Sequence, residues 1–263
     1  MLAVERRNQI LEKLQEEKKV IVSELSELFG VSEETIRRDL DRLDKEGLAV
    51  KSYGGAVLNE SAGIDLPFQV RRKKNMAGKQ RIGAIIAQLI QDGEHIILDP
   101  STTAVAIVKA LQHKQRLTVI TNSIEVLVEL ADKSGWDIIS SGGTLRENYL
   151  ALVGPRAMEG IASFNADKAI LSCKGIDMEK GITDANEMFS QVKQAMLSSA
   201  SQRILAADHT KFDKVAFSRI CEVTDIDMVV TDERPSEAWM EYFREKGIAC
   251  LYEKKDGNHC FCE

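Results

Sequence analysis

The segment from Val31 to Leu40 constrains the fold most, because it reads as the first half of a helix with two different faces. Ser32 is suited to cap this helix, and Glu33 and Glu34 suit the positive end of its dipole. Beyond the cap, apolar residues recur at i, i+4 and i+7, which places them on one side and polar residues on the other. The apolar side consists of Ile36, Leu40 and Leu43, and the polar side of Glu34, Thr35, Arg38 and Arg42. Such a helix can pack against a core and present its polar side to a groove.

The sequence around this helix predicts a winged helix-turn-helix. Residues 23–29 form a short helical pattern that Gly30 closes, which gives helix, tight turn and helix. The second helix of such a pair enters the major groove of DNA. Residues 51–57 then read as two strands that turn on a pair of glycines. Arginines on an amphipathic helix often form only a solvated face, so these flanking elements are what favour DNA binding.

The first 58 residues are not basic overall, since they contain 10 Lys and Arg against 12 Asp and Glu, a net charge of −2. Nucleic-acid binding usually leaves a basic footprint, so the contacts must come from local arrangement. The expected DNA contacts are Ser32, Thr35, Arg37, Arg38, Arg42, Lys51 and Tyr53. Because one such head offers few phosphate contacts, we expect a homo-oligomer that binds double-stranded DNA through several heads.

The remainder of the chain predicts a linker and an α/β domain. Residues 59–67 mix Ser, Gly, Pro and acidic residues without periodicity, and basic residues follow, so we expect a linker over 59–74. It separates a head at 1–58 from a larger domain at 75–263. From Lys79 onward strand and helix patterns alternate, which predicts a mostly parallel sheet with ligands at the carboxyl ends of its strands. Strands are expected at 95–99, 117–121, 137–140, 168–173, 203–207, 227–231 and 248–252, and helices at 82–91, 102–111, 123–132, 154–163, 185–200 and 236–246.

Small polar residues follow the predicted strands. Hydroxyl groups and free amides at the start of a helix bind anions, and glycines let the backbone approach a ligand closely. Each such residue alone is more often a helix cap or a solvated lysine. Together they predict a pocket for a small phosphorylated ligand at one rim of the sheet. The expected residues are Asp99, Ser101, Thr102, Thr103, Thr121, Asn122, Ser123, Gly142, Gly143, Lys174, Gly175, Asp177 and Lys193.

With these motifs, the chain resembles the DeoR family of bacterial transcription regulators. In the head the resemblance rests on Arg6, Ile10, Leu14, Ser32 and the segment TIRRDL at 35–40. In the larger domain it rests on motifs that include 99–103, 121–123, 142–146, 175–177, 181–184 and 208–212. The resemblance implies a winged helix-turn-helix followed by a Rossmann-like sensor domain similar to ribose-5-phosphate isomerase. It also implies a repressor of a carbohydrate-metabolism operon that binds operator DNA and is controlled by a phosphorylated sugar.

Two positions depart from the family pattern. Pro100-Ser101 replaces the more usual small residue and glycine, which narrows the expected anion loop. Phe189 stands where many members have glutamate, so the identity of the effector does not transfer from one member to this chain.

Other functions were weighed against a regulator. A sugar-phosphate isomerase with a DNA-binding head would need a placed general base, whereas the rim offers Asp99, Asp177 and Asp184 without an obvious acid and base pair. Asp208-His209 beside hydroxyl residues suggests hydrolase chemistry, but no nucleophile elbow accompanies it. A purely architectural DNA-binding protein would leave the polar rim unexplained.

Cysteine usage and hydropathy predict a cytoplasmic protein without a membrane partner. Five cysteines, an odd number without CxxC spacing, favour a reducing compartment. The sequence begins with a charged helical pattern rather than a signal peptide, and no apolar run has the length of a membrane span. The tail His259-Cys260-Phe261-Cys262 could hold a metal but lacks a distant pair of ligands, so we expect no metal and no cofactor.

Overall fold

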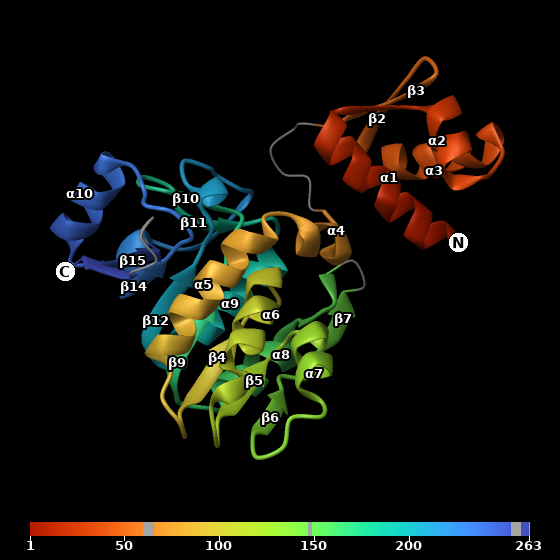
Figure 1. Ribbon diagram of the computed structural model, residues 1–263. Helices are drawn as coiled ribbons and strands as arrows, with labels where there is room; N and C mark the ends of the chain where they lie inside the picture. Colours follow the sequence, from red (N-terminus) through yellow and green to blue (C-terminus); the bar gives the residue numbers. More distant parts are fainter. Residues whose placement is uncertain (60–65, 147–148, 254–258, 263) are drawn as a thin grey trace. The chain divides into compact units, whose positions relative to one another are not determined.

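The computed structural model divides into two compact units, Met1–Lys74 and Asn75–Glu263 (Figure 1). It describes residues 1–59, 66–146, 149–253 and, for the backbone alone, 259–262. Part of the expected linker at 59–74 therefore lies outside the described residues, and its second half is helix α4 (Phe68–Lys73) of the first unit. Val70 is buried in the apolar core of that unit, so apolar burial decides the structure of this basic stretch.

Helices α1, α2 and α3 and a three-stranded antiparallel sheet, in the order β1-β3-β2, make up most of the first unit. Their bounds are α1 (Ala3–Glu17), β1 (Lys19–Ile21), α2 (Val22–Phe29), α3 (Glu33–Lys45), β2 (Ala49–Ser52) and β3 (Gly55–Leu58). Ser32 caps α3 by accepting a hydrogen bond from the Thr35 amide at 3.3 Å, and Gly30 ends α2 in the left-handed region, at φ 62°. The predicted winged helix-turn-helix is thus confirmed. The sequence did not predict β1, because three residues are too few to show an alternating pattern.

A buried ion pair joins α1 to α3 inside the first unit. Arg6 Nε lies 2.5 Å from Asp39 Oδ2, and both side chains are less than one tenth exposed. Arg7 approaches the second carboxylate oxygen at 3.6 Å. The apolar stripe of the same helix is buried as predicted, in a core that includes Ile10, Leu11, Leu14, Leu25, Ile36, Leu40 and Leu43. Removing either partner of the pair would leave an uncompensated buried charge, at a cost of about 3–5 kcal/mol.

An eight-stranded sheet, in the order β16-β15-β14-β12-β9-β4-β5-β6, forms the centre of the second unit. Its strands run parallel except for β16, which is antiparallel to β15. The strands are β4 (His95–Leu98), β5 (Thr118–Thr121), β6 (Asp137–Ser140), β9 (Ala166–Leu171), β12 (Ala200–Ala206), β14 (Met228–Val230), β15 (Ala249–Glu253) and β16 (His259–Cys262). The side chains of β16, including the cysteines considered above as metal ligands, lie outside the described residues.

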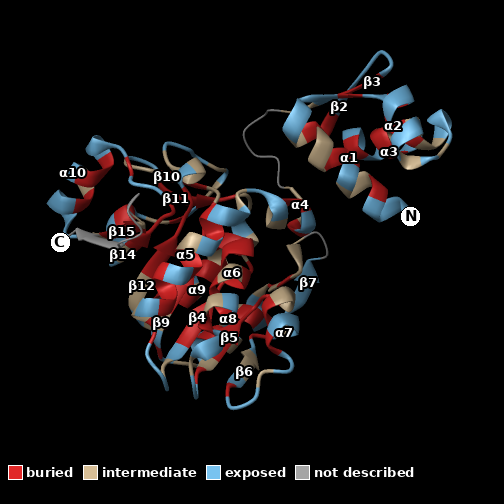
Figure 2. Cartoon of the chain, in the orientation of Figure 1, coloured by how far each residue is buried: buried red, intermediate tan, exposed pale blue. Residues whose placement is uncertain are grey.

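Helices cover this sheet, as the alternating pattern predicted. They are α5 (Met76–Leu89), α6 (Thr102–Ala110), α7 (Ile124–Leu130), α8 (Pro155–Ala162), α9 (Glu187–Ser198) and α10 (Glu237–Lys246), with 3-10 turns η1 (Leu111–His113), η3 (His209–Lys211) and η4 (Val223–Asp225). Helix α5 packs against α6, and α8 packs against α9 (Figure 1). Figure 2 shows that the strands between these helices are largely buried. Alternate strand residues, such as Ile97, Leu205 and Val229, share one core with α8, α9 and α10.

In the described part of the second unit, β16 and five strands outside the large sheet were not predicted. The five strands outside the large sheet are short. They form the antiparallel pair of β7 (Thr144–Arg146) and β8 (Ala151–Val153) and a small sheet of β10 (Gly175–Asp177), β11 (Gly181–Asp184) and β13 (Ser218–Cys221). Each has only three or four residues, which is too short for a clear alternation of apolar and polar positions.

The strand order changes direction between β4 and β9. From β4 the chain continues outward to β5 and β6, then returns to β9 on the other side of β4 and proceeds to β12, β14 and β15. In open α/β sheets, the crevice at the carboxyl ends of the strands on either side of such a point is the usual ligand position. The residues after β4 and β9 are therefore the first place to look for a site.

Candidate nucleic-acid interface and ligand rim

The polar face of α3 carries most of the residues expected to contact DNA. The side chains of Arg38 and Arg42 are 78% and 63% exposed. Tyr53 lies in the turn between β2 and β3 and is fully exposed. The Lys51 amide donates to Asp44 Oδ1 at 3.1 Å, which fixes the wing to the end of α3. The expected residues thus lie at the cap of α3, along its outer face and on the adjoining wing.

Each cation expected at this surface already has a carboxylate partner in the same unit. The pairs are Arg37 with Glu33 at 2.5 Å, Arg38 with Glu34 at 3.3 Å, Arg42 with Glu46 at 2.6 Å, and Lys51 with Asp41. The three arginine pairs join residues four positions apart, which are neighbours on a helix surface. These ion pairs were not predicted from the sequence. The four-residue spacing between each arginine and its glutamate could have indicated them. Exposed pairs of this kind contribute about 0–1 kcal/mol to stability, so DNA can displace them.

A buried ion triad lies at the point where the sheet changes direction. Lys193 Nζ on α9 is 3.0 Å from Asp99 Oδ2 after β4 and 2.5 Å from Asp184 Oδ2 at the end of β11. It also donates to the Ser172 carbonyl after β9 at 2.6 Å, while the Ser172 amide donates to Asp99 at 3.0 Å. Burial opposes the charged form of Lys193, but the two carboxylates outweigh it and raise the pKa of this ammonium group.

The triad uses two of the residues expected in the ligand pocket, Lys193 and Asp99, to join parts of the fold. The structure buries the Lys193 ammonium group between two carboxylates, with 5% of the residue exposed. Two negative charges and one positive charge leave the triad with a formal charge of −1 when all three groups are ionised. Lys193 therefore holds the ends of β4, β9 and β11 together, and an anion at this rim must find its donors elsewhere.

Donors suited to an anion do lie next to the triad, at the start of α6. Ser101 caps this helix by accepting from the Ala104 amide at 2.9 Å, and Thr102 and Thr103 form its buried first turn. The first amides of a helix have no partner within it and favour negative charge. Asn122, which follows the neighbouring strand, donates to the Leu152 carbonyl at 2.8 Å. Its Oδ1 is buried and has no hydrogen-bond partner among the described residues, so it can accept from a ligand.

Two other residues expected at the rim, Thr121 and Ser123, make hydrogen bonds within the protein. The Thr121 hydroxyl donates to the Leu98 carbonyl at 2.7 Å, and Ser123 caps α7 through the Val126 amide. Gly142 and Gly143 follow β6 at φ 66° and 114°, and both are exposed. These glycines present an exposed stretch of backbone at the same carboxyl edge as α6.

The segment 174–177 lies in the small second sheet rather than in a loop. The Lys174 amide donates to the Thr183 carbonyl at 2.9 Å, and Gly175 begins β10 where a Cβ would lie 2.2 Å from the Lys214 carbonyl oxygen. Asp177 accepts from the amides of Glu179 and Lys180 and so closes the turn between β10 and β11. A turn thus uses Oδ1 of the Asp177 carboxylate.

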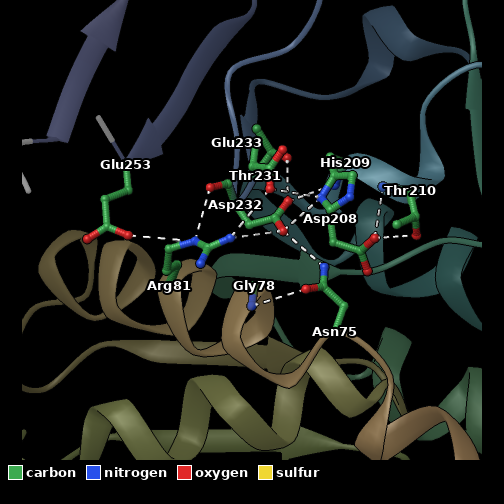
Figure 3. Close-up of polar contacts among 10 residues, drawn as sticks. All are labelled: Asn75, Gly78, Arg81, Asp208, His209, Thr210, Thr231, Asp232, Glu233 and Glu253. Carbon is green, nitrogen blue, oxygen red and sulfur yellow. Dashed lines mark hydrogen bonds and ion pairs between the residues drawn. The ribbon is translucent and has the colours of Figure 1, made fainter. Parts of the chain in front are cut away.

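A second polar cluster, which the sequence analysis did not assemble, lies at the ends of β12 and β14 (Figure 3). Its centre is Asp232, whose side chain is fully buried. Asp232 accepts from Asn75 Nδ2 at 2.9 Å and from the His209 amide at 2.7 Å, and His209 Nδ1 lies 3.0 Å from it. Arg81 on α5 adds a charge 3.5 Å away. Burial alone would raise the pKa of Asp232, but the hydrogen bonds from Asn75 and His209 lower it.

The same cluster contains a set of groups that could hold a metal ion. His209, Asp232 and Glu233 offer ligand atoms within 4.8 Å of one another. Arg81 Nη2, however, lies 3.5 Å from Asp232 and 3.7 Å from Glu233 and already supplies a positive charge to both. Asn75 occupies the same Asp232 oxygen that faces His209. The cluster is therefore better described as a protein-internal network than as a metal site.

No helix in the described part of the chain is both long enough and apolar enough to cross a membrane.

Comparison with known sequences identifies both units. The DeoR-like helix-turn-helix domain matches residues 6–62, and the DeoR C terminal sensor domain matches residues 74–233. The chain is 38% identical over 248 residues to the uncharacterized HTH-type transcriptional regulator YulB of Bacillus subtilis, covering 94% of this chain and 96% of the relative. It is 35% identical over 256 residues to the HTH-type transcriptional repressor GlcR of the same organism, covering 97% and 98%.

One further relative and one solved structure are also similar to this chain. The glycerol-3-phosphate regulon repressor of Escherichia coli is 30% identical over 248 residues, with 94% of this chain and 98% of the relative covered. Among solved structures, ribose 5-phosphate isomerase A from Methanocaldococcus jannaschii is 13% identical, with a TM-score of 0.39 over 53% of this chain and 55% of that chain. A likeness at that level carries no argument about function.

The contact between His209 and Asp232 predicts a pH dependence of stability. Burial lowers the pKa of His209, but Asp232 outweighs this and raises it above the ordinary value of 6.5. Stability from a raised histidine pKa is fully present below about pH 6.5 and is lost as pH rises through the folded-state value. Thermal denaturation of the intact protein from pH 5.5 to 8.5 should therefore show a decline that His209→Gln flattens. His113→Gln, which changes an exposed histidine elsewhere, should retain the wild-type slope; equal slopes for wild type and His209→Gln would refute the assignment.

Proposed function

This chain belongs to the DeoR family of transcription regulators, and we propose that it represses genes of carbohydrate metabolism until a phosphorylated sugar binds its second unit. The chain is a DNA-binding regulator and not an enzyme. The observation that carries the ligand proposal is the open acceptor and donor set beside the buried triad, which consists of the first amides of α6 and Asn122 Oδ1.

The proposed ligand class follows from the charge of that set. Helix amides favour an anionic group, and an unsatisfied amide oxygen favours a hydroxyl donor, so a ligand with both groups fits best. A sugar phosphate has both. The relatives support this class, since one is named as the repressor of a glycerol-3-phosphate regulon. Isomerase chemistry is less well supported, because Asp99 and Asp184 are both held by Lys193 and neither is available as a general base.

The variant Arg38→Ala tests the proposed DNA interface. If Arg38 reads a guanine edge, Arg38→Ala should weaken operator binding by about 1–3 kcal/mol and relax the preference at one base pair. If it holds a phosphate, binding should weaken evenly across sequences. Fluorescence anisotropy with the duplex that the wild-type protein selects from a random library would measure both effects. Arg219→Ala, an exposed change in the second unit, is the control. An unchanged affinity in Arg38→Ala would remove this residue from the interface.

A thermal-shift screen with phosphorylated sugars should identify the ligand class. A ligand at one hundred times its dissociation constant adds about 2.7 kcal/mol of stability. Thr102→Val, which keeps the volume of a buried side chain and removes its hydroxyl, should reduce the shift given by the best sugar phosphate. Thr118→Val, at the opposite end of β5, should not. Equal stabilisation by the unphosphorylated sugar would contradict recognition of the phosphate.

We also propose that the protein acts as a homo-oligomer in the cytoplasm. A head of net charge −2 gives one copy little electrostatic attraction to DNA, so tight binding requires two or more heads on one duplex. Light scattering of the intact protein should give at least a dimer at concentrations that bind operator DNA tightly. A monomer under those conditions would overturn this part of the proposal.

A further inference from the structure

The recognition helix carries more acidic than basic residues. From Glu33 to Glu46 there are four Lys and Arg against six Asp and Glu. Two of the acids, Glu33 and Glu34, form the first turn of α3, the part of such a helix whose residues contact base edges. A surface that held DNA mainly by attraction to phosphate would place cations there. The acids therefore need a role of their own.

The geometry of the pairs suggests what that role is. Glu34 holds Arg38 through Nε at 3.3 Å, so the terminal Nη1 and Nη2 edge of the guanidinium group is not used by this pair. Glu33 holds Arg37 through Nη2 at 2.5 Å. Both carboxylates are exposed, at 47% for Glu33 and 62% for Glu34, and so remain close to any duplex that the helix approaches.

We propose that Glu33 and Glu34 are specificity-determining residues that suppress binding to non-operator DNA. The inference rests on the proposed role of α3 as the recognition helix. On an arbitrary duplex, a phosphate that approaches either guanidinium group also comes close to the carboxylate that the arginine holds. The carboxylate repels the phosphate and so offsets much of its attraction to the arginine.

On the operator the balance differs, because a guanine accepts two hydrogen bonds through O6 and N7. An arginine edge that meets both is a bidentate contact with strong base discrimination. Arg38 can make it while Glu34 still holds Nε, and the uncharged base edge is repelled less by this carboxylate than a phosphate is. Glu34 then orients the guanidinium group. The acids thus penalise phosphate contacts in general and tolerate base contacts in the correct register. Specificity for the operator then comes from weaker binding to other sequences as well as from stronger binding to the operator.

The test compares Glu33→Gln/Glu34→Gln with wild type on two duplexes. One is the sequence that the wild-type protein selects from a random library, and the other is a scrambled duplex of the same base composition. Glutamine keeps the side-chain size and removes the charge, and both positions are exposed, so the fold should persist. The single variants Glu34→Gln and Glu27→Gln are compared with each other as a matched pair, because each removes one negative charge. Glu27 is exposed on α2, and no arginine pairs with it in the described structure.

The double variant should bind the scrambled duplex about 3- to 10-fold more tightly and the selected duplex less than 2-fold more tightly. Two freed arginines should also make the slope of log K against log salt for the scrambled duplex steeper by about 1 to 2. Glu34→Gln should show part of this effect, and Glu27→Gln should shift both duplexes equally.

Two results would overturn the inference. One is an equal change on both duplexes in the double variant, as expected for net charge alone. The other is a selective loss on the selected duplex without any gain on the scrambled one, as expected if the acids contact cytosine directly. Failure of the wild-type protein to select any sequence would instead refute the proposed DNA-binding role of α3.

Discussion

The ammonium group of Lys193 is the constraint on which the second unit depends most. Strands β4 and β9 are paired, and the segments that follow them lie at the carboxyl edge where the strand order changes direction. Lys193 fixes these segments by contacting the residues after both strands and the end of β11 at once. Because the triad has an excess of negative charge, it also dictates where an anion can lie. We therefore propose that the phosphate of the ligand binds at the backbone amides of α6 rather than beside the triad.

In the first unit, the buried ion pair of Arg6 and Asp39 likewise joins two elements. A small three-helix head has little apolar surface to bury, so a buried charge pair that joins α1 to α3 sets the angle at which the outer face is presented. In both units the buried charges are paired between different elements, whereas the exposed arginines of α3 are paired with glutamates four positions away. The buried pairs stabilise the fold, whereas the exposed arginine pairs on α3 can be replaced by contacts with another partner.

Local patterns allowed much of this structure to be predicted from the sequence, while long-range pairing could not be. The stripe of Ile36, Leu40 and Leu43 and the alternation of strands and helices are properties of neighbouring residues, and both were correct. Lys193 was expected at this rim, but its ion pairs with Asp99 and Asp184 were not predicted. Its partner Asp99 lies 94 positions earlier in the sequence, and no periodicity reports such a contact. The cluster around Asp232 was missed for the same reason, since it unites residues from the start of α5, from η3 and from the segment after β14.

The contact of Asp232 with Asn75 has a consequence for how such regulators can be recombined. Asn75 is the first residue of the second unit, caps α5 from the left-handed region at φ 46°, and is tied to Asp232. Three residues later, a Cβ at Gly78 would lie 2.2 Å from the same carboxylate. A chimaera that joins the head of one relative to the body of another should therefore be spliced before Asn75. A junction within 75–78 would divide the hydrogen-bonded residues Asn75 and Gly78 between two parents.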